Sequence, residues 1–541
     1  MNTIRDYAPI IAKICASEGD LTMVPAPHGF PFKEAYPGQA EAVEKIRGSD
    51  EALLCSETGS GKTAVFLSDA GDGHSTLIIE PRKFLQNQVA EYRGDVPVFG
   101  RGHYPCKFEP TAATAPCRGK KHENEDGDKV FTAFTPAGKE IECLFPCSTC
   151  AYYIAVNRGL SALHNGETVV ANFGNFRRFL PFAERVIIDE ADLFFQSMSS
   201  GVQLKYVDKF AGNTKDTLSA ERHNAEAALK TAQSFKARNS HESRDIVSQI
   251  DKAENHLATV TDLMDQADLC FQYMKRGENG RSHVYVEIKP GELNALKSRL
   301  FPKKDSKGRD RKLIVVTATP SAFDTKNVVT YRIFQRTAIF YSPVGLMTAT
   351  NVSKNPEVLK DCAKFIEETH KGFKQMFGPS ANKTIIHCGN LGTHAKAMQQ
   401  YLGFDKCDMH QSGKLMEIIE GFKKSSSEYL LVCAAEYGGD FHDINHQFVI
   451  KYPYGTFDER LRAYQQEVGE REFSEWYAMD AMNRCVQECG RVGRGAGSTG
   501  FTFILDRKFA EMFGKYRSKV PKWFISRLAK SGTLIPQERE P

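Results

Sequence analysis

The stretch LLCSETGSGKT (53–63) constrains the fold of this chain more than any other part of its sequence. A short apolar run leads into a glycine-rich turn, and AVFL follows as the opening of a helix would. Gly59 and Gly61 let the backbone approach phosphates closely, so that its N–H groups can cradle them. Lys62 is expected to reach the β- and γ-phosphates, and the hydroxyl of Thr63 to bind Mg²⁺. The pattern therefore predicts a parallel α/β domain that binds ATP. The remaining ATP-binding positions of this loop are Glu57, Thr58 and Ser60.

An acidic motif further along supplies the partner that a phosphate-binding loop needs for its metal. In RVIIDEAD (185–192), the run VII is typical of a buried β-strand, and the carboxylates follow its end. Parallel sheets bind their ligands at that edge. Asp189 is therefore predicted to hold Mg²⁺ through water, and Glu190 to polarise the water that attacks the γ-phosphate.

A third motif, LIVVTATP (313–320), indicates another strand that ends in hydroxyl groups. Thr317 and Thr319 are predicted to bond to the loop of Asp189 and Glu190 and to couple it to the state of the nucleotide. Threonine is found at the end of many strands, so this motif indicates a nucleotide site only together with the other two motifs.

A basic motif, QECGRVGR (487–494), is predicted to lie on a helix. Arg491 and Arg494 are three residues apart and Gln487 precedes Arg491 by four, so all three side chains would share one face. Two arginines held over a γ-phosphate stabilise the charge of the transition state. Arg491 and Arg494 are therefore candidate arginine fingers, with Gln487 beside them in the catalytic set.

These four motifs, in this order, resemble those of superfamily 2 helicases, which have two RecA-like domains with ATP in the cleft between them. Three apolar runs, 383–388, 429–434 and 446–452, are expected to be strands of the second domain. The resemblance also implies further site residues. These are Gln39 as the adenine contact, Asp440 near the nucleotide, and Arg82 with Lys83 as contacts to nucleic-acid phosphates.

More than a hundred residues separate Asp189 from the TATP motif, which indicates an insert in the first domain. Apolar residues recur there every three or four positions from Ile246 to Phe271, as on a long helix with one apolar face. An alanine-rich helix starting near Leu218 precedes it, and NSHES (239–243) is typical of a turn. A helical hairpin is the simpler prediction, and a coiled coil for dimerisation is the alternative.

A cluster of cysteines marks a second insert, upstream of the acidic motif. Five of the 14 cysteines lie close together, namely Cys106, Cys117, Cys143, Cys147 and Cys150. Structural thiols are one interpretation, and zinc is another, because CSTC has the C-x-x-C spacing of zinc sites. An iron–sulfur cluster held by four thiolates is the third. Residue types alone do not separate iron from zinc.

The chain resembles the XPD/DinG (Rad3-related) branch of superfamily 2 DNA helicases over most of its length. Matching segments are VFGRGHYPC (98–106), CAYYIA (150–155), VVANFGNF (169–176) and ELNALKSRLF (292–301). The resemblance implies a [4Fe–4S] cluster rather than zinc, held by four of the five cysteines, with Cys117 or Cys143 completing the set. It also implies an arch made by the helical insert, single-stranded and forked DNA as partners, and 5′→3′ movement. Two positions depart from the family: Asp192 stands where histidine is usual, and Tyr36 where arginine is frequent.

The expected fold class is α/β, with two RecA-like P-loop domains and both inserts in the first of them. The predicted segments are 1–100, 151–195 and 299–335 for the first RecA-like domain, 101–150 for the iron–sulfur domain, 196–298 for the arch and 336–541 for the second RecA-like domain.

The predicted activity is ATP-dependent DNA unwinding by a monomer inside the cell, in the cytoplasm, nucleoid or nucleus. No apolar run approaches the roughly 20 residues of a membrane span, so no membrane partner is expected. A net charge of +4 does not by itself predict nucleic-acid binding, and the basic cluster KKDSKGRDRK (303–312) is either a polyanion site or a solvated loop. Two other functions stay open: a single-strand translocase that remodels nucleoprotein without unwinding, and an RNA helicase.

Overall fold

The protein is described from a computed structural model that covers most of the chain. The described residues are 4–19, 21–70, 73–81, 83–106, 112, 122–123, 128–134, 140–144, 150–199, 201–238, 244–277, 280–319, 323, 327–411, 414–433, 441, 444–530 and 533–534.

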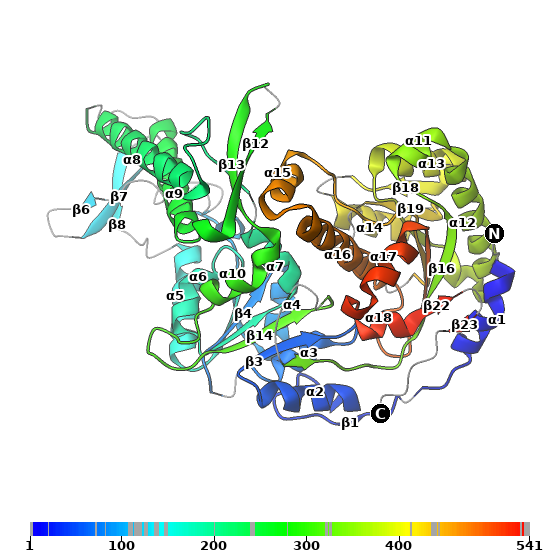
Figure 1. Cartoon of the computed structure of the whole chain (residues 1–541). Helices are drawn as coiled ribbons and strands as arrows, with labels where there is room; N and C mark the ends of the chain where they lie inside the picture. The colour runs from blue at the N-terminus through cyan, green and yellow to red at the C-terminus, as the bar shows by residue number, and fades with distance from the viewer. Residues whose placement is uncertain are drawn as a thin grey trace. The chain divides into compact units, whose positions relative to one another are not determined.

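Two sheets of mainly parallel strands form the framework, which confirms the predicted α/β class (Figure 1). The first sheet has the strand order β15-β3-β14-β10-β4-β9-β5. Its strands are β3 (Glu51–Cys55), β4 (Thr76–Glu80), β5 (Val96–Val98), β9 (Thr168–Asn172), β10 (Arg185–Ile188), β14 (Lys312–Thr317) and β15 (Val328–Val329). The strand β4 is buried at every position, as expected for a parallel strand covered on both faces.

The second sheet has the order β18-β19-β17-β20-β21-β16-β22-β23. Its strands are β16 (Arg336–Gly345), β17 (Thr384–His387), β18 (Cys407–Met409), β19 (Tyr429–Val432), β20 (His446–Val449), β21 (Thr499–Asp506), β22 (Leu528–Lys530) and β23 (Thr533–Leu534). The three runs predicted as strands of the second domain are present as β17, β19 and β20, and β17 pairs in parallel with both of the others.

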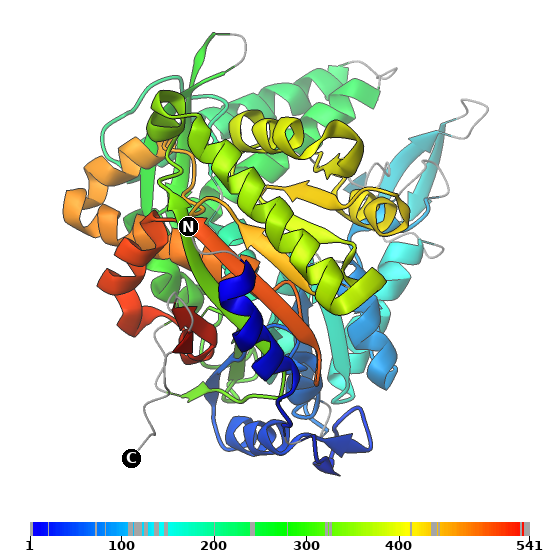
Figure 2. The ribbon, with the colours of Figure 1, turned by 90° about the vertical axis from the view of Figure 1, so that its right-hand side faces the viewer.

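The N-terminal helix α1 (Ile4–Cys15) packs onto the second sheet. Tyr7 and Ile11 are buried in the same apolar cluster as Phe340 and Phe503, and the Ser342 hydroxyl donates to the Tyr7 hydroxyl at 2.6 Å. Figure 2 shows this helix lying over the strands of the sheet. The first residues of the chain therefore contribute to the core of the second sheet.

The chain divides into two compact units. The first unit comprises Met1–Ser68, Val316–Thr456 and Ser474–Pro541, and it holds the glycine-rich loop, the basic motif and the second sheet. The second comprises Asp69–Val315 and Phe457–Phe473, and it holds the acidic motif and both inserts. The domain boundaries proposed from the sequence stay predictions.

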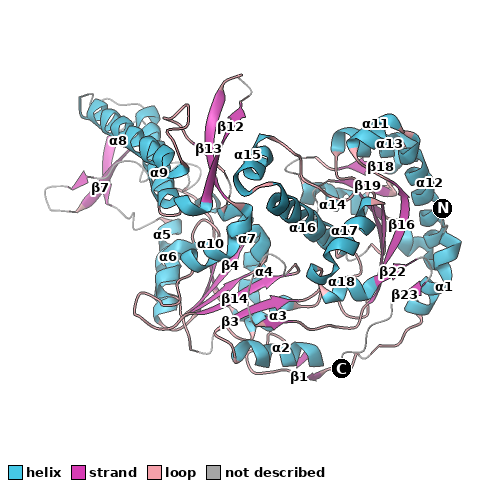
Figure 3. Ribbon diagram, in the orientation of Figure 1, coloured by secondary structure: helices cyan, strands magenta, loops and turns pink. Residues whose placement is uncertain are grey.

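The helical insert folds as the predicted hairpin, in which α8 (Thr214–Arg238) packs against α9 (Arg244–Met264) (Figure 3). Leu218 on α8 and Val260 on α9 are fully buried. A buried polar pair also joins the helices, because His256 of α9 hydrogen-bonds to the Glu221 carboxylate of α8. The turn predicted at 239–243 lies outside the described residues.

The apolar stripe of the insert continues in the sequence beyond the end of its helix. The α9 helix ends at Met264, whereas Ala267 lies in a 3₁₀ turn and Phe271 in the strand β12 (Cys270–Arg276), so the prediction of one helix through Phe271 is wrong. This strand belongs to an antiparallel sheet with β13 (Ser282–Ile288) and β11 (Val202–Gln203), which was not predicted.

The remaining elements surround these sheets or belong to the cysteine-rich insert. The helices are α2 (Pro37–Arg47), α3 (Lys62–Leu67), α4 (Lys83–Arg93), α5 (Ala151–His164), α7 (Ala191–Met198), α12 (Glu357–Phe377), α15 (Glu459–Val468), α16 (Glu470–Cys489), α17 (Lys508–Tyr516) and α18 (Lys522–Arg527), and the cysteine-rich insert contains the strands β6 (His122–Glu123), β7 (Lys129–Phe134) and β8 (Glu140–Leu144). Within the described residues, no helix combines the length and apolar character that a membrane crossing requires.

Candidate nucleotide-binding site

The glycine-rich loop joins β3 to α3, as predicted. Gly59 (φ 75°) and Gly61 (φ 79°) adopt the left-handed conformation that other residues rarely take. Lys62 opens the helix, and its ammonium group donates to the carbonyl oxygens of Ser56 at 3.0 Å and Glu57 at 3.1 Å. The loop's own carbonyls therefore hold the predicted phosphate-binding cation within the turn.

Gln39 contacts this loop from α2. Its side-chain amide donates to the carbonyl of Ser60 at 2.9 Å, and its carbonyl oxygen accepts from the Tyr36 backbone N–H at 3.1 Å. A Cβ atom on Gly61 would lie only 2.6 Å from the Gln39 amide nitrogen, so glycine is needed there for space as well as for backbone conformation. Gln39 thus braces the loop, and the predicted contact to adenine stays a prediction.

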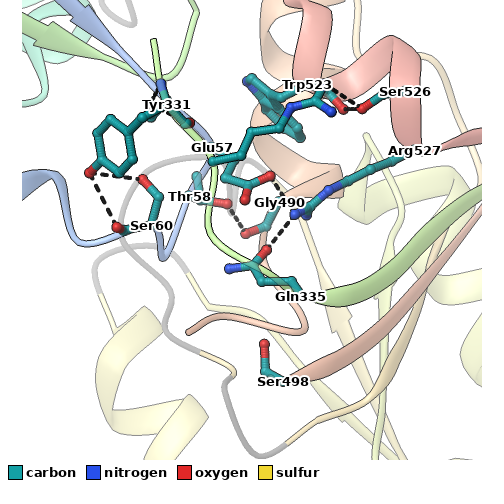
Figure 4. A network of polar contacts seen from close by, with 12 residues as sticks. Glu57, Thr58, Ser60, Tyr331, Gln335, Gly490, Ser498, Trp523, Ser526 and Arg527 are labelled. Atoms are coloured by element: carbon teal, nitrogen blue, oxygen red, sulfur yellow. Dashed lines mark hydrogen bonds and ion pairs between the residues drawn. The ribbon is translucent and has the colours of Figure 1, made fainter. Parts of the chain in front are cut away.

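Tyr331 also bonds to this loop, through its backbone and its hydroxyl. Ser56 and Tyr331 exchange two hydrogen bonds, in which the Ser56 hydroxyl donates to the Tyr331 carbonyl at 2.9 Å and accepts from the Tyr331 N–H at 3.0 Å. The Tyr331 hydroxyl also donates to the Ser60 carbonyl at 3.1 Å, and Figure 4 shows this ring lying against the loop. Ser56 stands where the general phosphate-loop pattern G-x-x-x-x-G-K-[ST] has its first glycine, and its hydroxyl group links the loop to the Tyr331 backbone.

Glu57 forms a buried ion pair with Arg527 at the end of α18 (Figure 4). The guanidinium group also donates to the Gln335 side chain at 2.6 Å and lies 5.8 Å from the centre of the Trp523 ring. Burial raises the pKa of the Glu57 carboxyl group, although nearby cations, Arg527 first among them, oppose this shift. Burial likewise lowers the pKa of Arg527. Sequence reasoning missed both Tyr331 and Arg527, because neither belongs to a recognisable motif.

The basic motif meets the loop through Gly490. The Thr58 hydroxyl donates to the Gly490 carbonyl, and a Cβ atom on Gly490 would collide with that hydroxyl (Figure 4). A Cβ atom on Gly59 would lie 2.8 Å from the Cβ atom of Arg494, so the two motifs are packed together at backbone level. The structure thus brings the glycine-rich loop and the basic motif into direct contact.

The prediction that Arg491 and Arg494 share a helical face is wrong. The α16 helix ends at Cys489; Arg491 lies in the turn that follows, and Arg494 lies in the loop after it. Gly493 adopts a positive φ of 66°, a conformation that does not continue a right-handed helix. Gln487 is in the last helical turn, and Arg491 is buried, with 6% of its surface exposed.

The acidic motif follows the end of β10, as predicted. Glu190 has φ 46° and is the only non-glycine residue with a positive φ in the part of the chain that the structure describes. Its N–H donates to the Asp189 carboxylate at 2.9 Å. Such a conformation costs about 1–3 kcal/mol and is found most often at functional sites. The strained turn directs two consecutive carboxylates from the edge of the strand.

Glu80, at the end of β4, is a carboxylate that sequence reasoning missed. It is fully buried, and burial raises its pKa well above the ordinary value, with the carboxylates of Asp189 and Glu190 raising it further. Three acidic side chains therefore meet at the ends of adjacent parallel strands. The signal was present in LIIE (77–80), where an acidic residue follows an apolar run in the same way as Asp189 follows VII.

Thr317 and Thr319 are both buried, and the Thr319 N–H donates to the Thr317 hydroxyl at 3.0 Å. Their predicted contact with the acidic motif stays a prediction.

Lys83, predicted to bind nucleic-acid phosphates, is the first residue of α4. It is exposed, and its ammonium nitrogen lies 5.4 Å from the centre of the Phe99 ring. Arg82 and Asp440 lie outside the described residues.

Three of the five clustered cysteines are described. Cys106, Cys143 and Cys150 are partly exposed, in contrast to core thiols such as Cys362 and Cys388. Cys117 and Cys147 lie outside the described residues. Among the residues described, no group of three metal-binding side chains is assembled. The partly exposed thiols have the chemistry that a metal cluster needs and do not serve as core residues.

The segments that flank the cysteine-rich insert pack on each other through an arginine and two tyrosines. The guanidinium carbon of Arg101 lies 4.6 Å from the ring centre of Tyr152 and 5.4 Å from that of Tyr153, whose hydroxyl accepts a hydrogen bond from Arg101 at 3.0 Å. The Tyr152 hydroxyl donates to Asn175 at 2.8 Å. These contacts join the start and the end of the insert.

Comparison with known proteins gives two family matches and a fold. Residues 36–95 match the DEAD/DEAH box helicase family, and residues 387–527 match the helicase C-terminal domain. A solved XPD helicase shares 13% identity with a TM-score of 0.57, covering 92% of this chain and 100% of its own. An apo XPD structure shares 11% identity with a TM-score of 0.52, covering 91% and 99%. No curated protein sequence matches the chain.

Proposed function

We propose that this chain, which matches two helicase family models and has an XPD-like fold, is an ATP-dependent DNA helicase of superfamily 2 that moves 5′→3′ on single-stranded DNA. The contact between the glycine-rich loop and the basic motif, through Thr58 and Gly490, supports this proposal most directly. In such an arrangement, the loop that binds the phosphates and the backbone that carries the arginines move together, so phosphate binding affects the position of the arginines that stabilise the transition state.

Each catalytic residue has a proposed role in ATP hydrolysis. Lys62 binds the β- and γ-phosphates and Thr63 binds Mg²⁺, whose second protein contact is Asp189 through water. Glu190 polarises the attacking water. Arg491 and Arg494 balance the charge that develops on the γ-phosphate, and Gln487 lies beside them. Thr317 and Thr319 bond to the loop of Asp189 and Glu190 and couple it to the state of the nucleotide.

The proposal includes a [4Fe–4S] cluster held by four of Cys106, Cys117, Cys143, Cys147 and Cys150. Partial exposure of the three described thiols supports it, since a core role would bury them. Four thiolates around a cluster cross-link a segment too small for a large apolar core of its own. Iron and zinc analysis of the purified protein is the test, and a colourless sample replete with zinc would reject the cluster.

A lysine substitution tests the motor. Lys62→Ala should abolish DNA-stimulated ATP hydrolysis, whereas the exposed Lys45→Ala on α2 should leave it intact. Retained hydrolysis in Lys62→Ala would remove the P-loop from the mechanism. ATPase stimulation by single-stranded DNA and by RNA of the same sequence separates a DNA enzyme from an RNA helicase.

Direction and unwinding are tested on forked duplexes that carry only a 5′ or only a 3′ single-stranded tail. The proposal expects ATP-dependent strand separation from the 5′-tailed substrate. Hydrolysis without separation, together with displacement of a bound protein block, would instead identify a translocase that remodels nucleoprotein. Unwinding from the 3′ tail alone would contradict the proposed direction.

A further inference from the structure

A glutamine lies in the middle of the second sheet, where parallel strands are ordinarily apolar. Gln447 is in the central strand β20, between β17 and β21, and it is fully buried. Its register partners are Ile385 on one side and Thr502 on the other. A buried amide is costly unless its hydrogen bonds are made, so its partners indicate what it is for.

The amide nitrogen of Gln447 faces the C-terminal end of α16. It lies 2.8 Å from the Glu488 carbonyl oxygen, 3.0 Å from that of Cys489 and 2.8 Å from the Thr502 hydroxyl. The Thr502 hydroxyl in turn donates to the Cys489 carbonyl at 3.2 Å. The last carbonyls of a helix have no partner within the helix, and here side chains from two sheet strands satisfy them.

His387, at the end of β17, fixes the orientation of the glutamine. Its Nε2 lies 3.1 Å from the Gln447 carbonyl oxygen, so Nε2–H donates and the amide nitrogen must point towards the helix. Burial, together with the nearby Arg491, lowers the pKa of His387 to about 4 although the hydrogen bond to Gln447 opposes the shift, and this keeps the ring neutral near pH 7. The Glu488 carboxylate lies 3.7 Å from the other ring nitrogen.

The same helix end leads directly into the nucleotide site. The Glu488 carbonyl that Gln447 contacts also accepts from the Arg491 N–H at 3.2 Å. Two residues further along, the Gly490 carbonyl accepts a hydrogen bond from the Thr58 hydroxyl of the glycine-rich loop. One buried amide is therefore attached to the backbone that carries the first arginine and contacts the loop.

We propose that Gln447 is a positioning residue for ATP hydrolysis, which anchors the end of α16 to the sheet and thereby places Gly490 and Arg491. His387 and Thr502 complete this anchor. The inference rests on the proposed function of Arg491, and it adds a residue that lies in none of the motifs.

The first test is Gln447→Met, which keeps the length of the side chain but has no N–H to donate. The kcat for DNA-stimulated ATP hydrolysis should fall about 10- to 100-fold, with the KM for ATP changing less than about threefold, because the interaction affects the transition state. Thr384→Val is the matched control. It removes hydrogen bonds to His370 and His446 from an equally buried position in the same sheet, at the other end of β17.

Positioning and mere stability make opposite predictions for these two variants. Both should lower the urea midpoint, but only Gln447→Met should lower kcat. An equal loss of kcat in Thr384→Val, or an unchanged kcat in Gln447→Met, would overturn the inference.

A double-mutant cycle gives the second test. If Gln447 acts through Arg491, adding Gln447→Met to Arg491→Ala should produce little further loss in single-turnover rate. Full additivity of the two losses would show that Gln447 acts elsewhere. The control for the premise is separate: if Arg491→Ala hydrolyses ATP as fast as the unaltered chain, then the proposed role of Arg491 has failed rather than that of Gln447.

Discussion

Replacing Arg527 by glutamine removes the cation that faces the buried Glu57 carboxylate in the glycine-rich loop. The Glu57 side chain is 1% exposed and the Arg527 side chain 17% exposed, so water replaces little of the lost interaction. Removing one partner of a buried ion pair typically costs about 3–5 kcal/mol, because the remaining charge stays buried. Arg527→Gln is therefore expected to destabilise the first unit by about that amount.

The companion variant is Glu57→Gln/Arg527→Gln, which removes both charges. Burial dominates the pKa shifts of both groups, so the charged pair gains little over a neutral one. The double variant should be more stable than Arg527→Gln alone, with a coupling of about 2 kcal/mol between the two changes. Urea unfolding followed by fluorescence measures it, and simple additivity of the two single losses would refute the reasoning.

The pH dependence gives an independent check on the same pair. The folded-state pKa of Glu57 is raised, so its contribution to stability is full at low pH and is lost as the pH rises through the folded pKa. Loss of Arg527 removes the largest opposing charge and should raise that pKa further. The cost of Arg527→Gln should therefore shrink as the pH falls from 7 to 5, and a cost that grows on acidification would contradict this assignment.

Two further variants test other parts of the molecule. Gly490→Ala should lower the kcat for ATP hydrolysis by at least about tenfold, because its Cβ atom would collide with the Thr58 hydroxyl; Gly514→Ala, which meets no atom within 4 Å, is the control in the same assay. Glu221→Ala should speed hydrogen exchange throughout the α8–α9 hairpin without altering ATP hydrolysis on single-stranded DNA. The substitution would leave the N–H groups of Lys205 and Tyr206 without their acceptor, which costs about 1–3 kcal/mol for such a group. The control is Glu226→Ala, at a partly exposed position on the same helix, which should change neither measurement.

The sequence predicted best where local chemistry dictates local structure. The glycine-rich turn, the strand before Asp189 and the two helices of the hairpin each follow from a pattern within one continuous segment of the sequence. Helix ends were predicted less well, because the apolar stripe through Phe271 continues from α9 into a strand without changing its residue types. Likewise, the spacing of Arg491 and Arg494 suits a helix, but the glycines between and beside them end it.

Contacts between distant segments could not be predicted from local patterns. The basic cluster at 303–312 illustrates the point, since Arg311 is buried and donates to the carbonyls of Leu180, Ala183 and Pro302. Asp305 in the same cluster is buried and bonds to the Arg309 side chain at 2.7 Å. Neither of the two interpretations from sequence, a polyanion site or a solvated loop, includes these internal partners.

The glycine-rich loop shows how far such contacts reach into the site itself. Successive residues of the loop contact three different segments that follow it by hundreds of positions: Ser56 bonds to Tyr331, Glu57 to Arg527 and Thr58 to Gly490. Because Arg527 and Gly490 are among these partners, the phosphate-binding shape of the loop depends on the C-terminal part of the chain as well as on its own glycines. A chain shortened to residues 1–335 would keep the whole motif and Tyr331 but lose the other two partners. It should therefore bind ATP more weakly than the intact protein even if β3 and α3 still form, and equal affinity in an ATP titration would show that the loop holds its shape alone.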